Sequence, residues 1–132
     1  MPFELDAEEQ RVLGTLIEKQ LATPQYYPLT LSALVQGCNQ ATSREPVTAY
    51  DETTVRMTIQ RLKDKQLVRT IYPTHGRSVD RYAHALEAAL PLIPAELALL
   101  GMLLLRGPQT ENELAPRPQP PAARRPPPTP PS

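Results

Sequence analysis

A helix-like segment that runs directly into two strand-like stretches constrains this fold more than any other feature of the sequence. Between residues 51 and 66, apolar side chains recur at helical spacing, and Asp51 can cap the start of that helix. Residues 67–72 and 79–83 have the β-branched and aromatic composition of strands, and turn-forming residues fill 73–78 between them. The pattern predicts a helix followed by a β-hairpin. The core side of the helix would carry Val55, Ile59, Leu62 and the stem of Gln66.

Two further helices are predicted before this one. Asp6 can cap the first, with Glu9 completing a capping box, and the helix must end before Pro24. Thr30 can cap the second, LSALVQGCN, which carries an apolar stripe. Three helices followed by a hairpin are typical of a winged helix-turn-helix, so we expect a mainly α fold with a small β-hairpin (α+β).

Composition limits where the chain can act. The 132 residues contain a single cysteine, which suits a reducing compartment. The acidic N-terminus does not resemble a signal peptide, and the apolar block 97–105 is too short to span a bilayer. We therefore expect a cytoplasmic protein that is not embedded in a membrane.

The charge is distributed unevenly along the chain. Residues 56–81 contain seven basic and two acidic side chains, whereas residues 1–18 contain five acidic and one basic. This distribution predicts that the third helix and the hairpin form the basic end of a dipolar molecule, which is the sign that contact with phosphates requires. The alternative is that these charges only keep a helix surface solvated.

The outward face of the third helix suggests how DNA would be read. Arginine can form two hydrogen bonds with guanine and glutamine two with adenine, so three side chains of this helix are candidates for base edges and three further basic residues for phosphates. A DNA-binding regulator of transcription is the first functional hypothesis. The predicted contacts are Arg56, Gln60 and Arg61 with bases, and Lys63, Arg69 and Arg77 with phosphates, with His75 as a lesser candidate.

A protein-interaction module is the alternative hypothesis. Met57 is predicted to lie exposed among polar residues, where methionine more often meets a partner than water. A second group lies in the connection before the third helix and could form either a binding site or a local hydrogen-bond network, of which we favour the network. That group is Asn39, Gln40, Arg44 and Glu45.

The sequence gives little support for catalysis. Cys38, His75 and His84 are isolated from one another, whereas a metal site needs ligands at short, repeated spacing. Cys38 also lies on the apolar stripe of the second helix, which predicts a buried structural cysteine. We expect no enzymatic activity, no cofactor and no metal.

Several unusual segments resemble those of the YceH-like family of uncharacterised bacterial proteins. The most specific is Cys38-Asn39-Gln40 followed by Thr42-Ser43-Arg44-Glu45-Pro46-Val47, although Ala41 stands where a lysine is usual. Glu18-Lys19, Thr23-Pro24 and Tyr27-Pro28-Leu29-Thr30 also match, and the similarity extends from about residue 5 to 113. The resemblance implies two tandem winged helix-turn-helix domains and carries over no activity.

The second domain is expected to be incomplete. Residues 1–90 would form the first domain, and 91–115 the first helix and the start of a second winged-helix domain. Residues 116–132 hold nine of the 17 prolines and read as a disordered Pro/Arg-rich tail, expected from truncation or a shifted reading frame. A proline-motif or nucleic-acid-binding tail is the alternative. The 95–106 helix, apolar and lacking its own domain, predicts a homodimer.

Overall fold

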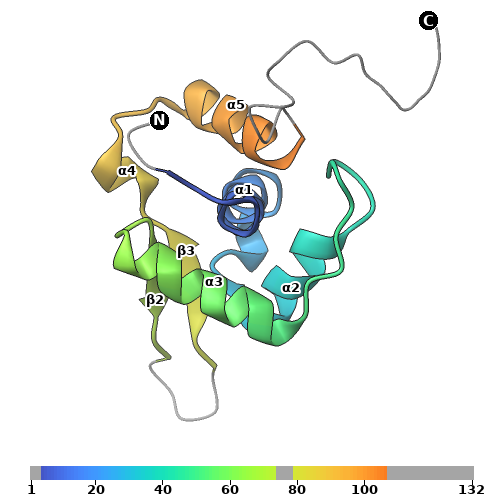
Figure 1. Cartoon of the computed structure of the whole chain (residues 1–132). Helices are drawn as coiled ribbons and strands as arrows, with labels where there is room; N and C mark the ends of the chain where they lie inside the picture. The colour runs from blue at the N-terminus through green and yellow to red at the C-terminus, as the bar shows by residue number, and fades with distance from the viewer. Residues whose placement is uncertain (1–3, 74–78, 107–132) are drawn as a thin grey trace, which may run out of the picture.

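The computed structural model describes residues 4–73 and 79–106, which form a helical body with a small antiparallel sheet on one side (Figure 1). The helices surround α1, and the sheet lies beside α3. This architecture confirms the expected α+β, winged-helix-like fold. In chain order the elements are α1 (Ala7–Ala22), the 3-10 turn η1 (Pro24–Tyr26), β1 (Leu29–Thr30), α2 (Leu31–Asn39), α3 (Glu52–Asp64), β2 (Val68–Ile71), β3 (Arg81–His84), α4 (Leu86–Ala89) and α5 (Pro94–Leu105).

The predicted caps begin all three N-terminal helices. At α1 the Glu9 N–H donates to Asp6 Oδ1 at 2.8 Å, and the Asp6 N–H donates to Glu9 Oε1 at 2.9 Å. The Thr30 hydroxyl accepts from Ala33 N–H, and Asp51 accepts from Thr54 N–H. Each cap satisfies a backbone donor that the first turn of a helix leaves without an intrahelical partner. The helix starts are therefore determined locally.

The end of α3 differs from the prediction. The helix stops at Asp64, and Gln66 has φ 64°, in the left-handed region. The Leu67 N–H reaches back to the Leu62 carbonyl, which is the hydrogen bond of a Schellman motif with Gln66 in its left-handed position. Gln66 is therefore exposed, and the prediction that its stem lies on the core side of the helix was wrong. The tight reversal is what allows β2 to begin immediately after α3.

The sheet has three strands in the order β1-β3-β2, all antiparallel. The two predicted strands are confirmed, with β2 shorter at both ends and β3 shifted to 81–84, but β1 was not foreseen, because two residues are too short for a sequence pattern. Leu29 pairs with Tyr82, and Thr70 pairs with Tyr82 from the other side. Most of the predicted turn, residues 74–78, lies outside the described residues.

One core joins these elements. The buried apolar side chains come from α1, α2, α3, the two edge strands β1 and β2, and the C-terminal helices. Cys38 lies among them, fully buried, which confirms its predicted position on the apolar stripe. The main members are Val12, Leu13, Leu16, Ile17, Leu34, Cys38, Val55, Ile59, Leu62, Leu67, Val68, Leu86 and Leu104.

Helix α5 packs closely against α1. A Cβ added at Gly14 would lie 2.8 Å from Leu105 Cγ, and one added at Gly101 would lie 2.8 Å from Ile17 Cγ2. Glycine is needed at both positions because the two helices approach each other there. Within the described residues, 91–106 thus pack on the first domain, and the predicted second domain beyond them stays a prediction. No helix in 4–73 or 79–106 has the length and apolar character to cross a membrane.

Candidate nucleic-acid interface

The solvent-facing strip of α3 is the first component of the candidate site. Val55, Ile59 and Leu62 point into the core as predicted, and the opposite side of the helix is open to solvent. Met57 has 59% of its surface exposed, which confirms its predicted exposure. We call this side the α3 strip; it consists of Thr53, Arg56, Met57, Gln60 and Asp64.

Two basic residues of the same helix region are turned toward α1 instead. Arg61 Nη2 lies 2.9 Å from Glu8 Oε1 and 3.3 Å from Asp6 Oδ2. Lys65 Nζ lies 2.9 Å from Oε1 of Glu9, whose side chain is almost completely buried. The acidic N-terminus and the basic helix therefore pair with each other. The predicted dipolar molecule was wrong, because two segments that are separate in the sequence are neighbours in the fold.

Arg56 and Gln60 have only local partners among the described residues. Arg56 Nη2 donates to Glu52 Oε1 at 3.0 Å, four residues earlier, and both side chains are more than half exposed. Gln60 Nε2 donates to Asp64 Oδ1 at 3.1 Å. Exposed pairs at this spacing contribute only about 0.3–0.5 kcal/mol, so a stronger partner could displace them.

The hairpin borders one side of the α3 strip. Burial raises the pKa of Tyr82 on β3, nearby Asp80 raises it further, and the positive charge of Arg56 opposes both. Arg56 is thus close to β3 of the hairpin. Lys63 is half-buried and lies two helical turns after Arg56, on the same side of α3. Arg56, Lys63 and β3 therefore lie along the same edge of the α3 strip.

Arg69 lies on a different face of the sheet. It pairs with Ala83, whereas its neighbour Val68 pairs with His84, and Val68 belongs to the core. Since side chains alternate along a strand, Arg69 points away from the core-facing side to which Tyr82 belongs. The predicted contacts therefore do not all gather on one surface. Arg77 and His75 lie outside the described residues.

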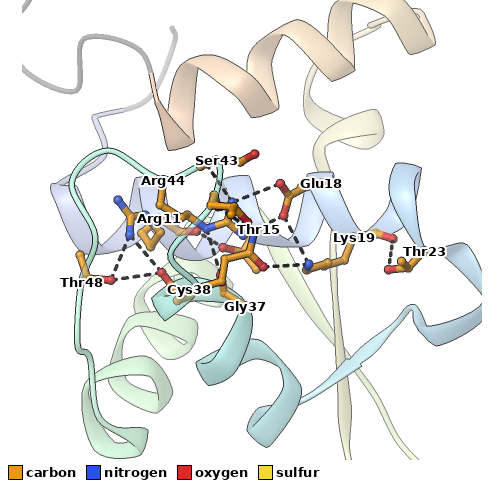
Figure 2. Close-up of polar contacts among 12 residues, drawn as sticks. Arg11, Thr15, Glu18, Lys19, Thr23, Gly37, Cys38, Ser43, Arg44 and Thr48 are labelled. Atoms are coloured by element: carbon orange, nitrogen blue, oxygen red, sulfur yellow. Dashed lines mark hydrogen bonds and ion pairs between the residues drawn. The ribbon is translucent and has the colours of Figure 1, made fainter.

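A buried polar network occupies the connection between α2 and α3 (Figure 2). Arg44 is buried and donates to both carboxylate oxygens of Glu18, at 2.7 and 3.1 Å. Its Nε donates to the Gly37 carbonyl at 2.9 Å. Burial acts to raise the pKa of Glu18, but the hydrogen bond and charge of Arg44 outweigh it, so the pKa lies below its usual value. Arg44 thus joins α1, the C-terminus of α2 and the connecting loop.

A second buried arginine, Arg11, also forms hydrogen bonds at the C-terminal end of α2. Arg11 Nη1 donates to the Cys38 carbonyl and to the Thr48 hydroxyl, each at 3.0 Å, and Nη2 donates to the Pro46 carbonyl. The last carbonyls of α2 have no intrahelical partner, and two arginines satisfy two of them. Asn39 fixes the loop further by bonding both the N–H and the carbonyl of Tyr50.

The remaining members of the predicted loop group also have structural contacts. The Gln40 side chain accepts from Lys19 Nζ at 3.1 Å and donates to the Thr42 carbonyl at 2.8 Å. The Glu45 N–H donates to the Leu105 carbonyl at the end of α5. These contacts agree with the interpretation of the group as a local hydrogen-bond network. Sequence reasoning singled out Arg44 but gave Arg11 and Glu18 no role in this network, because both lie on the side of α1 opposite its apolar stripe.

The Cys38 thiol and the potential metal ligands can be placed among the described residues. Burial raises the pKa of the Cys38 thiol to about 11, which keeps it protonated and unreactive near neutral pH. Within 4–73 and 79–106, no group of three potential ligands among His, Cys, Asp and Glu could hold a metal ion. The fold and this surface define a winged-helix-like protein with an exposed helix face.

Comparison with known proteins identifies the family. Residues 5–121 match the family model described as "Protein of unknown function, DUF480". The chain is 50% identical to a "UPF0502 protein" of Opitutus terrae, over 86% of this chain and 49% of the relative. It is also 50% identical to relatives from Azotobacter vinelandii (88% of this chain, 50% of the relative) and Geotalea daltonii (89% and 53%). The chain belongs to this uncharacterised bacterial family, which confirms the resemblance. It spans about half the length of these relatives.

Proposed function

We propose that this protein binds duplex DNA through the α3 strip, with the hairpin beside it. Arg56 and Gln60 contact base edges in the major groove, and Lys63 contacts a phosphate. Arg77, at the predicted hairpin turn, is the second phosphate contact. A bacterial regulator of transcription in the cytoplasm is the biological role that fits such binding.

One observation carries this proposal. Arg56 and Gln60 lie one turn apart on an exposed helix face, near β3 of the hairpin, and among the described residues each is engaged only by an exposed side chain of its own helix. Arg56 would lose little by leaving Glu52 for a DNA phosphate or a guanine, because its pair with Glu52 is exposed and contributes little to stability. Both side chains can therefore turn outward without a large loss of stability.

Two of the originally predicted contacts are left out of this interface. Arg61 would have to give up Asp6 and Glu8 before it could meet a base. Arg69 lies on the outer face of the sheet, on the opposite side from Tyr82. Both residues become useful comparisons, since each carries the same charge as Arg56 at a different place in the fold.

The experiment is a salt titration of binding to short random duplexes, followed by fluorescence anisotropy. The Arg56→Ala/Gln60→Ala variant is expected to bind more weakly, with a shallower dependence of affinity on salt. Arg69→Ala is the matched control and is expected to bind like the wild type. The proposed interface would be refuted if the wild type did not bind duplex DNA at low salt. It would also be refuted if Arg69→Ala lost as much affinity as Arg56→Ala/Gln60→Ala.

A protein-interaction module remains the second candidate, on a specific observation. Met57 is exposed at the centre of the α3 strip, and intramolecular pairing of Arg61 and Lys65 reduces the positive charge beside it. Such a surface suits a partner with an apolar contact and a few polar groups. The same titration separates the two candidates, because this one predicts only weak DNA binding that the Arg56→Ala/Gln60→Ala variant does not change.

A further inference from the structure

Helix α5 presents an apolar stripe on the side that faces away from α1. Leu104 and Leu105 are buried beneath the helix, whereas Leu99, Met102 and Leu103 remain 56%, 55% and 48% exposed. These three side chains recur at spacings of three and four residues, so they lie on one side of the helix. Three large apolar side chains gathered on one exposed face are typical of an interaction surface.

The stripe carries one charge of each sign, one at each end. Glu96 lies three residues before Leu99, and Arg106 lies three residues after Leu103, and both are exposed. No other residue from 95 to 106 is charged. At 1.5 Å per residue, the acid and the base are about 15 Å apart along the helix. The surface is therefore apolar in the middle, negative near its N-terminal end and positive at its C-terminal end.

The stripe is complementary to a second copy of itself in the antiparallel orientation, because the negative end of one then meets the positive end of the other. We propose that a second copy of this chain covers the stripe, with the two α5 helices antiparallel about a two-fold axis at the level of Gly101. In this register Leu99 lies opposite Leu103 of the second copy, and Glu96 lies opposite Arg106 of the second copy. One register satisfies both the apolar and the charged contacts, and symmetry repeats each of them. A parallel pair would place Glu96 against Glu96 and Arg106 against Arg106.

The surface next to the stripe extends the apolar area. A groove of about 460 Å³ between α1 and α5 has a mainly apolar lining that includes Leu21, Ala98 and Met102. Leu21 is itself 43% exposed on α1. The second copy thus meets an apolar area wider than one helix. Since α5 and α3 pack on different sides of α1, the dimer leaves the α3 strip uncovered (Figure 1).

A charge-reversal cycle tests this arrangement on the full chain. Sedimentation equilibrium would compare the wild type with Glu96→Arg, Arg106→Glu and the double variant. Each single variant is expected to raise the dimer dissociation constant about tenfold at low salt, because symmetry doubles the loss of a weak surface pair. The double variant is expected to restore dimerisation. The Glu96 side chain also accepts from the Ile93 N–H at the start of α5, and the double variant leaves that bond broken, so recovery cannot come from helix stability.

Cysteine crosslinking tests the register separately. In a mixture of Leu99→Cys and Leu103→Cys chains, a disulfide is expected between the two kinds of chain and only weakly within either kind. Matched far-UV circular dichroism of every variant would show that the fold is kept. A wild-type chain that is monomeric throughout the micromolar range overturns the proposal, whatever else covers the stripe. A dimer that is indifferent to the charge reversals, or that crosslinks Leu99→Cys with itself, overturns it equally.

Discussion

Replacing Arg44 with methionine should destabilise the fold strongly. The guanidinium of Arg44 is fully buried, forms two hydrogen bonds with the Glu18 carboxylate and donates to the Gly37 carbonyl. Arg44→Met would leave a partly buried carboxylate without its counter-charge and a helix-end carbonyl without a donor. Breaking a buried ion pair on one side costs about 3–5 kcal/mol. The Glu18 side chain is 23% exposed, so water can reach it, and we expect a loss of about 3 kcal/mol.

This loss should be measurable by thermal and urea denaturation followed by circular dichroism. For a domain of this size, about 3 kcal/mol corresponds to a fall in Tm of about 12–24 °C. A Glu18→Gln partner variant completes a double-mutant cycle, in which the double variant should be more stable than the sum of the single losses predicts. Arg69→Met is the matched control at an exposed arginine and should change the unfolding free energy by no more than about 0.5 kcal/mol.

The pH dependence of the unfolding free energy tests the Arg44–Glu18 pair more strictly. The pKa of Glu18 lies below its usual value of 4.5 in the folded chain, so the pair stabilises the fold above that pH and the benefit is lost as pH falls below it. The difference in unfolding free energy between the wild type and Arg44→Met should therefore narrow below pH 4.5. A fall in Tm of less than about 4 °C, or strictly additive losses in the cycle, would refute the role assigned to Arg44.

Three further variants test other parts of the structure. Gly14→Ala should destabilise by about 1–3 kcal/mol in urea denaturation, since its Cβ would lie 2.8 Å from Leu105 Cγ; a gain in stability, as helix propensity alone predicts, would contradict the close α1–α5 contact. Burial lowers the pKa of His84, so the unfolded chain binds more protons below 6.5 and stability should fall as pH falls through that value. His84→Gln should make the unfolding free energy less dependent on pH between about pH 7 and 5. An unchanged dependence would show that other groups cause it. Cys38, with its pKa raised to about 11, should react with a thiol reagent only as fast as the chain unfolds, and rapid labelling of the native protein would show that it is accessible.

Local chemistry explains why the helices were predictable. Asp6 with Glu9, Thr30 and Asp51 each satisfy backbone donors within three residues of themselves, so the start of each helix is written in a few neighbouring positions. The spacing of apolar side chains likewise identifies the buried face of α3. For the same reason the hairpin could be recognised, and with it the winged-helix-like order of elements.

The electrostatics of the candidate site were not predictable in this way. Counting charges along the chain grouped Arg56 and Arg61 together, yet one faces solvent and the other is paired with α1 carboxylates more than 50 positions away in the sequence. The placement of Arg69 also depends on strand register, which sets the face that each residue occupies. Which cations remain available to a ligand is therefore a property of the packing.

The sequence by itself determined the three N-terminal helices, the hairpin after them and the membership of the family, because caps, helical periodicity and the CNQ and REPV segments are local patterns. Only the tertiary structure decided that Arg11 and Arg44 donate hydrogen bonds to the carbonyls at the end of α2. It also decided that α5 packs on α1 with one apolar side exposed to solvent. These outcomes depend on contacts between distant segments. Their free energy arises only when the segments are packed together, so no local pattern in the sequence records them.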